Sequence, residues 1–356
     1  MKRRDFVTKG VAGTLGIGLT GCSTGRPRKI QLWRELAPFI PRPKGGTMSM
    51  SELGKTGIKI SNFGFGSHIR AEMRGYDNQR EYIIHEAYDL GINVFDVYDE
   101  EEGVSTGGSY QYEPFGKQIA PFKNDILISI SFHPYDGRTP EQELERDLRL
   151  FGRDHIDLVR ILREPDHPIW EMLFRAKEKG YIRALGAPIH DMEQVDMLLG
   201  KVPIDYILFP YNFYHNLCWI DEKEDNFDAL PIRLRQNGIG VLTMKPFAGD
   251  YLIKPFMDIA KYFKKIPEIS FPQAALRYVI NSGVKPASTL TGMYNLHHLY
   301  ENVAAYYNPA MSAEERELLN NIRNTASRTA NAWLPDHYKW LEKWADKGQN
   351  TAGTTA

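Results

Sequence analysis

The two cysteines, Cys22 and Cys218, are the most reactive side chains in the sequence. Neither lies in a CxxC pattern and no HExxH pattern occurs, so ligand spacing gives no support to a structural or catalytic zinc site. Cys22 ends a candidate lipidation signal, and its acylation would leave Cys218 without a disulfide partner. This arrangement favours a protein that folds in a reducing compartment.

Glycines that could hold a phosphate are the next candidates. Gly64-Phe65-Gly66 opens like a dinucleotide fingerprint, but its continuation SHIRAE lacks the third glycine, which argues against a Rossmann sheet. Gly292 instead precedes a helix expected to start at Asn295, where free backbone N–H groups and the helix dipole can receive phosphate. A well-capped helix without a ligand is an almost equal alternative.

Short apolar strands alternate with amphipathic helices in the part of the chain that must position these residues, after a hairpin-like start (SELGKTGIKISNFGFGS). Helical patterns include REYIIHEAYDLG, PEQELERDLRLFG and FPQAALRYVINSG. The expected strands are Asn62–Gly66, Asn93–Asp96, Ile126–Ser131, Asp157–Leu162, Ala184–Gly186, Tyr206–Phe209, Gly240–Met244 and Pro286–Leu290. Eight such units predict an α/β fold, a closed (β/α)8 TIM barrel with its functional site on the loops after the strands.

Several segments carry a family resemblance along nearly the whole barrel. They are SELGKTGIKISNFGFG, LGINVFDVYD, YIRALGAPIH, FPYNFYHN, GVLTMKPFAG, PQAALRYVINSG and LTGMYNLHHLYENVAA. From about Ser51 to Tyr307 the chain resembles the aldo-keto reductases. The resemblance implies hydride transfer between a nicotinamide nucleotide, NAD or NADP, and a carbonyl, with a tyrosine as proton donor. A phenol, whose ordinary pKa is near 10, needs a nearby cation to become a better acid at neutral pH.

The catalytic residues implied by the resemblance are only partly present. Asp96 matches the family's aspartate, and Tyr110 is the preferred match for its tyrosine, with Tyr112 and Tyr98 as alternatives. Ser131 stands where the family has its lysine, with His133 two residues on, and Leu162 and Arg163 stand near the place of its histidine. Lys245 or His133 is a candidate replacement for the missing cation, although a Lys245 that only supports the rim of the barrel is an alternative. We expect Asp96, Tyr110 and Lys245 to be catalytic.

The cofactor contacts implied by the resemblance are also altered. Pro188-Ile189 and Leu208 replace polar residues that hold the nicotinamide, and His298 replaces an arginine that often binds the 2′-phosphate of NADP. The residues expected to bind NAD(P) are Gly292, Met293, Asn295, Glu301, Asn302 and Met244. The sequence does not separate NAD from NADP.

The N-terminal residues read as export signals. Arg3-Arg4 before an apolar run resembles a twin-arginine signal, and Leu19-Thr20-Gly21-Cys22 resembles a lipobox. We therefore expect a signal at residues 1–22, a flexible tether at 23–47, the barrel at 48–310 and a helical extension at 311–356. The protein would face the periplasm, anchored in a membrane through a lipid on Cys22.

Two hypotheses of function follow. The first is an NAD(P)-dependent carbonyl oxidoreductase acting on a small-molecule substrate, which outside the cytoplasm would need a tightly held cofactor or an electron-transfer partner. The second is a non-catalytic or repurposed barrel that binds a small ligand such as a sugar. A net charge of -1 and a pI near 6.8 give no electrostatic case for nucleic acid. In the C-terminal extension we expect Trp333, Trp340 and Trp344 to anchor a packed helix.

Overall fold

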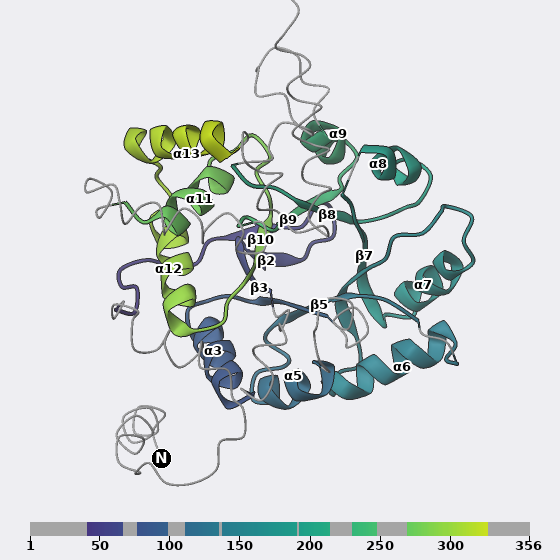
Figure 1. Cartoon of the computed structure of the whole chain (residues 1–356). Helices are drawn as coiled ribbons and strands as arrows, with labels where there is room; N and C mark the ends of the chain where they lie inside the picture. The colour runs from purple at the N-terminus through teal and green to yellow at the C-terminus, as the bar shows by residue number, and fades with distance from the viewer. Residues whose placement is uncertain are drawn as a thin grey trace, which may run out of the picture. The chain divides into compact units, whose positions relative to one another are not determined.

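The computed structural model describes residues 41–66, 77–98, 111–134, 137–190, 192–213, 230–247 and 269–326. Eight parallel strands close into a barrel in the order β10-β3-β4-β5-β6-β7-β8-β9 (Figure 1). The strands are β3 (Phe63–Gly66), β4 (Val94–Val97), β5 (Leu127–Ser131), β6 (Ile156–Arg160), β7 (Ile182–Pro188), β8 (Tyr206–Pro210), β9 (Gly240–Met244) and β10 (Ser288–Gly292). The predicted (β/α)8 TIM barrel is confirmed.

Helices surround this barrel and connect its strands. They are α3 (Asp77–Asp89), α5 (Tyr112–Ile119), α6 (Pro140–Phe151), α7 (Ile169–Glu178), α8 (Met192–Leu198), α9 (Leu230–Gln236), α11 (Phe271–Ile280), α12 (Leu296–Tyr307) and α13 (Ala313–Ala326). The local sequence explains how α6 begins and ends. Thr139 and Gln142 form a capping box at its start, and Gly152 ends it in the left-handed conformation with φ 60°. None of the helices in the described ranges is long and apolar enough to cross a bilayer.

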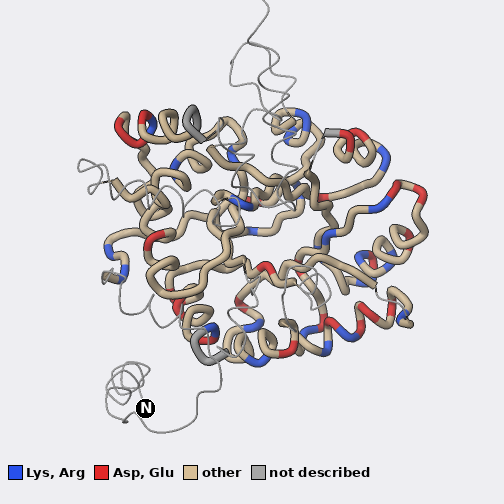
Figure 2. Tube along the Cα trace, in the orientation of Figure 1, with Lys and Arg blue, Asp and Glu red and all other residues tan. Residues whose placement is uncertain are grey.

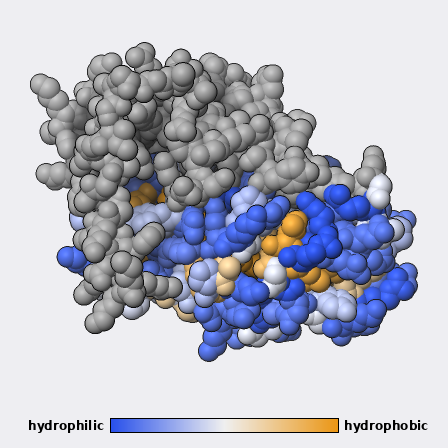
Figure 3. Space-filling view, turned by 90° about the horizontal axis from the view of Figure 1, so that it is seen from below, coloured by the Kyte–Doolittle hydropathy of each residue, from blue (hydrophilic) through white to orange (hydrophobic). Residues whose placement is uncertain are grey.

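Charged residues lie mainly on the outer helices, as Figure 2 shows along α6. The face seen in Figure 3, from below the view of Figure 1, is mostly hydrophilic in its described part, with apolar side chains gathered in a narrow strip. This distribution follows from amphipathic helices that turn one face to the sheet and the other to water.

The amino end of the barrel is closed by an antiparallel hairpin of β1 (Met50–Glu52) and β2 (Lys59–Ser61). Its apolar side chains Leu53, Ile58 and Ile60 belong to the same buried cluster as inward-facing strand residues such as Leu158 and Leu242. The hairpin is therefore a plug for the barrel interior, and the functional site has to lie at the opposite end.

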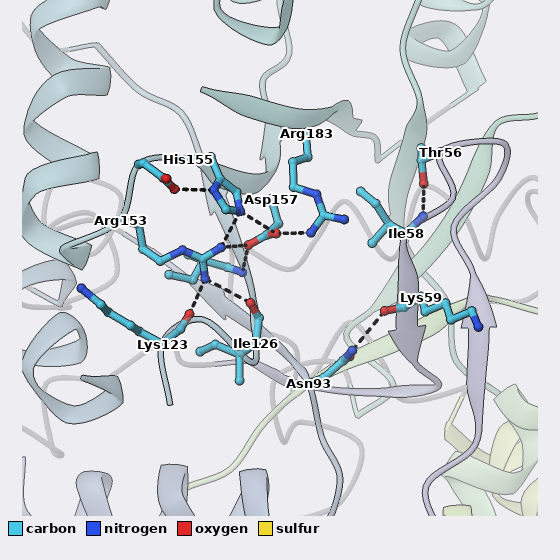
Figure 4. Close-up of polar contacts among 12 residues, drawn as sticks. Thr56, Ile58, Lys59, Asn93, Lys123, Ile126, Arg153, His155, Asp157 and Arg183 are labelled. Atoms are coloured by element: carbon cyan, nitrogen blue, oxygen red, sulfur yellow. Dashed lines mark hydrogen bonds and ion pairs between the residues drawn. The ribbon is translucent and has the colours of Figure 1, made fainter. Parts of the chain in front are cut away.

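A buried ionic cluster ties the strands together at this amino end (Figure 4). Asp157, on β6, accepts hydrogen bonds from the backbone N–H of Ile128 at 2.9 Å, from Arg153 at 3.0 Å and from Arg183 at 2.6 Å. The Asp157 and Arg153 side chains are only 1% and 3% exposed. Because charged groups this deep require partners, the cluster is a structural joint between β5, β6 and β7.

The segment just before the hairpin has no helix or strand among residues 41–49. Arg42 pairs with Glu86 of α3 at 2.5 Å, and a Cβ added to Gly46 would collide with the ring of Tyr307 on α12. The remaining residues of the expected tether, the export signal with Cys22, Cys218 and the three C-terminal tryptophans lie outside the described residues. These expectations stay predictions.

Candidate functional site

Strand alternation directs a small set of polar side chains into the barrel. On β4 the inward positions are Val94 and Asp96, and the residue two further along is Tyr98; on β6 they are Leu158 and Arg160. Asp96 and Arg160 are 2% and 1% exposed. Their neighbours in the interior are otherwise largely apolar, so each charge needs the other.

Asp96 and Arg160 form a two-point ion pair across the barrel interior. The two terminal guanidinium nitrogens donate to the two carboxylate oxygens, the Nη2–Oδ2 contact measuring 3.2 Å. Ser129 of β5 completes the arrangement by donating to Asp96 Oδ1 at 2.6 Å and accepting from Arg160 at 3.0 Å. The planar guanidinium matches a carboxylate in this fork geometry, which a lysine cannot reproduce.

Two tyrosines lie against this network. The Arg160 guanidinium carbon lies over the ring of Tyr98, 4.9 Å from its centroid, and Tyr98 is partly exposed. Tyr206 of β8 is fully buried, and burial raises the pKa of its phenol far above the ordinary value despite the opposing effect of Arg160. Tyr206 therefore stays protonated, whereas Tyr98 is accessible from the mouth.

The other predicted tyrosines differ from Tyr98 in their positions. Tyr112 begins α5, is 1% exposed, and donates its hydroxyl to the carbonyl of Ser131 at 3.3 Å. Its ring lies 4.8 Å from that of Phe151, so it packs between helices rather than at the mouth. Tyr110, the preferred match for the proton donor, lies outside the described residues.

The residues expected in place of the family's lysine and histidine make local contacts. Ser131 is 4% exposed and its hydroxyl lies 2.9 Å from Nε2 of His133. Arg163 donates to the carbonyl of Leu162 at 2.8 Å. The cation that pairs with Asp96 is thus Arg160, which the sequence analysis passed over. Strand alternation is the signal that could have found it, since an arginine at an inward position of a buried strand requires an acidic partner.

Lys245 lies at the rim where β9 ends, with its backbone in the left-handed region at φ 55°. Its carbonyl accepts a hydrogen bond from Asn212 at 3.1 Å, which holds this conformation. Burial lowers the pKa of His190 after β7 to about 3, and the positive charge of Lys245 adds to this effect. A neutral imidazole and an ammonium therefore lie together on this side of the mouth. A left-handed lysine is uncommon, and such strain is often found at functional sites.

The carboxyl end of β10 offers an open stretch of backbone. Gly292 pairs with Gly66 of β3, and a Cβ added to Gly292 would have no heavy atom closer than 3.9 Å. Gly292 is exposed and Met293 beside it is buried. Gly292 thus has open space beside its backbone, whereas at the start of α12 the N–H groups of Tyr294 and His298 have acceptors within the protein, His298 Nδ1 at 3.5 Å and Asn295 Oδ1 at 2.8 Å.

Three of the residues expected to bind NAD(P) lie at the start of α12 or along it, and two of these have partners within the protein. Asn295 caps the helix by accepting from the N–H of His298 at 2.8 Å. Glu301 is buried and accepts from Ser270 and from Gln273, at 2.9 Å, both at the start of α11. Asn302 is 3% exposed. Glu301 therefore joins α11 to α12, and its carboxylate is already hydrogen-bonded within the protein.

Met244, the last expected cofactor contact, points into the barrel at the top of β9. It is 7% exposed and belongs to the buried cluster that includes Leu208 and Leu290. Pro188 ends β7 and is partly exposed, and Ile189 behind it is buried. Met244, Pro188 and Ile189 thus give this side of the mouth an apolar surface, beside the polar side chains of His190 and Lys245, which follow them in sequence. Within the described ranges, no group of three or more His, Cys, Asp or Glu residues is placed to hold a metal ion.

Comparison with known proteins matches this geometry to one family. The profile of the aldo/keto reductase family aligns with residues 64–324, most of the chain. The chain belongs to the aldo/keto reductase family. It is 22% identical over 325 residues to L-galactose dehydrogenase of Arabidopsis thaliana, covering 81% of this chain and 97% of that protein. It is 28% identical over 203 residues to the aldo-keto reductase YhdN of Bacillus subtilis strain 168, covering 52% and 58%.

Solved structures agree on the fold of this aldo/keto reductase. An aldo-keto reductase from Bacillus halodurans superposes with a TM-score of 0.60 in its holo form and 0.58 in its apo form. Each comparison covers 77% of this chain and 96% of that one, at 19% identity. Family and fold together imply an oxidoreductase.

Proposed function

We propose that this aldo/keto reductase interconverts a carbonyl and an alcohol with NAD or NADP as the hydride carrier. The ion pair of Asp96 and Arg160 is the observation that carries the proposal. It lies at the carboxyl ends of β4 and β6, where a TIM barrel has its functional site, and Arg160 contacts the partly exposed Tyr98. A site that handles a proton needs fixed charge beside it, and this pair supplies that charge.

The residues present divide the work of such a site. The open backbone at Gly292, opposite Gly66, would form a phosphate cradle, with Met293 and Asn295 beside it and Asn302 further along α12. Bound nucleotide would supply the hydride. Met244 and Pro188 would contribute apolar surface beside the reacting carbon, with His190 and Lys245 near them. The charged side of the mouth, with Asp96 and Arg160, would act on the carbonyl oxygen of the substrate.

The substrate class follows from the relatives and from the described part of the mouth. One relative is named for L-galactose, so a panel of sugars oxidised at a hydroxyl or reduced at an aldehyde is the rational first choice, together with para-nitrobenzaldehyde as an unselective carbonyl. The apolar surface of Met244 and Pro188 and the positive charge of Lys245 favour a neutral or weakly anionic small molecule.

Nucleotide release tests the cofactor part directly. The purified, folded protein is denatured and the supernatant is assayed by mass spectrometry for nicotinamide nucleotides, with binding of added NADH and NADPH measured in parallel. Gly292→Trp is the blocked variant, because the open space at Gly292 lets a large side chain enter the cradle without disturbing the strands. Tyr181→Trp is its control, since Tyr181 is 46% exposed and precedes β7 at the amino end.

Nucleotide that binds the wild type and Tyr181→Trp but not Gly292→Trp would support the proposal and identify the cofactor. A folded wild type that neither contains nor binds either nucleotide would refute it, and would leave a barrel that binds another ligand, such as a sugar. Family membership does not favour that alternative.

We also propose that the chain is exported through its twin-arginine pair and anchored through a lipid on Cys22. The support is the order of the two motifs in the sequence. Cell fractionation tests it: Cys22→Ser should release the protein from the membrane fraction, and replacing Arg3 and Arg4 by lysine should retain it in the cytoplasm. Membrane attachment of the Cys22→Ser variant would contradict the lipid anchor.

A further inference from the structure

Tyr98 and Arg160 form a contact that the family resemblance does not predict. Tyr98 follows Asp96 by two residues and so leaves β4 on the same face, towards the barrel axis. The guanidinium carbon of Arg160 lies 4.9 Å from the centre of the Tyr98 ring, and the same guanidinium binds Asp96 on two points. The three side chains therefore form a chain of contacts from the buried carboxylate to the mouth.

Exposure separates Tyr98 from the other described tyrosines near the site. Tyr98 is partly exposed, whereas Tyr112 and Tyr206 are 1% and 0% exposed. The hydroxyl of Tyr112 is donated to the Ser131 carbonyl, and burial holds Tyr206 in its neutral form. Of these three tyrosines, Tyr98 is therefore the one with exposed surface that a substrate could contact.

The charge beside Tyr98 is of the kind that an acidic phenol requires. A cation near a phenol stabilises the phenolate that remains after the proton has left. A cation can also lie over the face of the neutral ring, so the contact persists before and after proton transfer. Asp96 and Ser129 fix the guanidinium through three hydrogen-bonding contacts, so its position does not depend on the substrate.

We propose that Tyr98 is the proton donor of this aldo/keto reductase and that Arg160, oriented by Asp96, is the positioning residue that replaces the missing lysine. This inference rests on the proposed nicotinamide-dependent function. In reduction, the carbonyl carbon gains a hydride from the reduced nicotinamide nucleotide, and the π electrons move to oxygen. The new O–H bond takes the Tyr98 proton, leaving phenolate, which recovers a proton from water. The carbonyl is reduced and the nucleotide is oxidised.

A cycle of variants tests whether Tyr98 and the ion pair act as one unit. The variants are Tyr98→Phe, the double variant Arg160→Met with Asp96→Asn, and the triple variant. Removing both charges together avoids leaving one of them buried without a partner, which would unfold the chain. Tyr112→Phe is the matched control, because it also removes one phenolic hydroxyl but at a buried position away from the mouth.

Reduction of para-nitrobenzaldehyde by the full-length enzyme gives kcat and KM, and NADH or NADPH binding gives Kd. Tyr98→Phe should lower kcat by about 10²–10⁴-fold with the nucleotide Kd unchanged. The double variant should lose a similar factor, and the triple variant no more than the double, because residues that act as a unit are not additive. Tyr112→Phe should keep its kcat.

Retention of kcat by Tyr98→Phe, or losses that multiply in the triple variant, would overturn the inference while leaving the proposed function intact. Failure of the wild type to bind either nucleotide would instead refute the proposed function. Nucleotide binding therefore distinguishes the two failures, because it involves neither Tyr98 nor Arg160.

Discussion

Replacing Asp157 by alanine should destabilise the barrel without altering its site. The carboxylate is 1% exposed and accepts from Arg153, Arg183 and the N–H of Ile128 at 3.0, 2.6 and 2.9 Å. Arg153 is itself 3% exposed, so the substitution leaves a buried cation without its carboxylate. Breaking one partner of a buried pair costs about 3–5 kcal/mol.

Urea denaturation followed by tryptophan fluorescence measures this loss. A loss of about 4 kcal/mol is a large share of the roughly 5–15 kcal/mol by which a domain is stable. The Tm of the Asp157→Ala variant should lie lower by on the order of 10 °C, since a destabilisation of about 1 kcal/mol lowers the Tm of a large domain by roughly 2–4 °C. Nucleotide binding at low temperature should match the wild type, because the cluster lies at the amino end of the barrel.

Glu171→Ala is the control. Glu171 and Arg175 form an ion pair at 3.3 Å on α7 with side chains 73% and 58% exposed. An exposed pair of this kind contributes less than about 1 kcal/mol, so the variant should unfold nearly as the wild type does. A loss in Asp157→Ala as small as that of Glu171→Ala would refute the assignment of the cluster as a structural joint.

Three further changes test other parts of the structure. Burial holds the pKa of His190 at about 3 against 6.5 in the unfolded chain, so the unfolded state binds more protons between these values and stability falls as pH drops below 6.5. Between pH 7 and pH 5 the free energy of unfolding of the wild type should fall by about 2 kcal/mol, and that of His190→Gln should not show this fall. Equal losses in the two proteins would contradict the low pKa of His190. Gly116→Ala should destabilise the protein by about 1–3 kcal/mol, despite alanine's higher helix propensity, because the new Cβ would lie 2.0 Å from the carbonyl oxygen of Leu150. An unchanged midpoint of urea denaturation would show that α5 and α6 can separate to make room. Lys245→Gly should change stability by less than about 1 kcal/mol, since relief of the left-handed strain offsets the added freedom of glycine. A fall in kcat in that variant would assign the effect to the ammonium group, and an unchanged kcat would show that Lys245 only supports the rim.

The barrel was predictable because its signals are local and repeated. All eight expected strands occur within about two residues of their expected ends, and α6 ends at Gly152 as its sequence indicates. β7 shows the largest error in length, since it was expected at Ala184–Gly186 and spans the seven residues Ile182–Pro188. A Cβ at Gly186 would collide with the ring of Tyr206, so the barrel interior selects glycine within this strand.

The site was less predictable because its charges are paired across strands far apart in sequence. Comparison with the family directs attention to the lysine position on β5, where Ser131 stands, and therefore away from Arg160 on β6. The structure pairs Asp96 with a residue 64 positions away, a separation that no local pattern encodes. Only the alternation of side chains along β6 links Arg160 to Asp96, since Leu158 and Arg160 both point into the barrel, where Asp96 lies.

The two ends of the barrel use buried arginine–carboxylate pairs for different purposes. Arg153 and Asp157 bind backbone groups of Ile126 and Ile128 and also contact His155 and Arg183, all at the closed amino end. Arg160 and Asp96 instead have Ser129 and Tyr98 as neighbours, and Tyr98 is partly exposed at the mouth. The place of each pair in the barrel therefore decides its use, because a pair beside the mouth can influence a reaction, whereas a pair at the closed amino end holds strands together. Substitution of Arg160 and Asp96 should therefore change turnover more than stability. Substitution of Arg153 and Asp157 should change stability more than turnover.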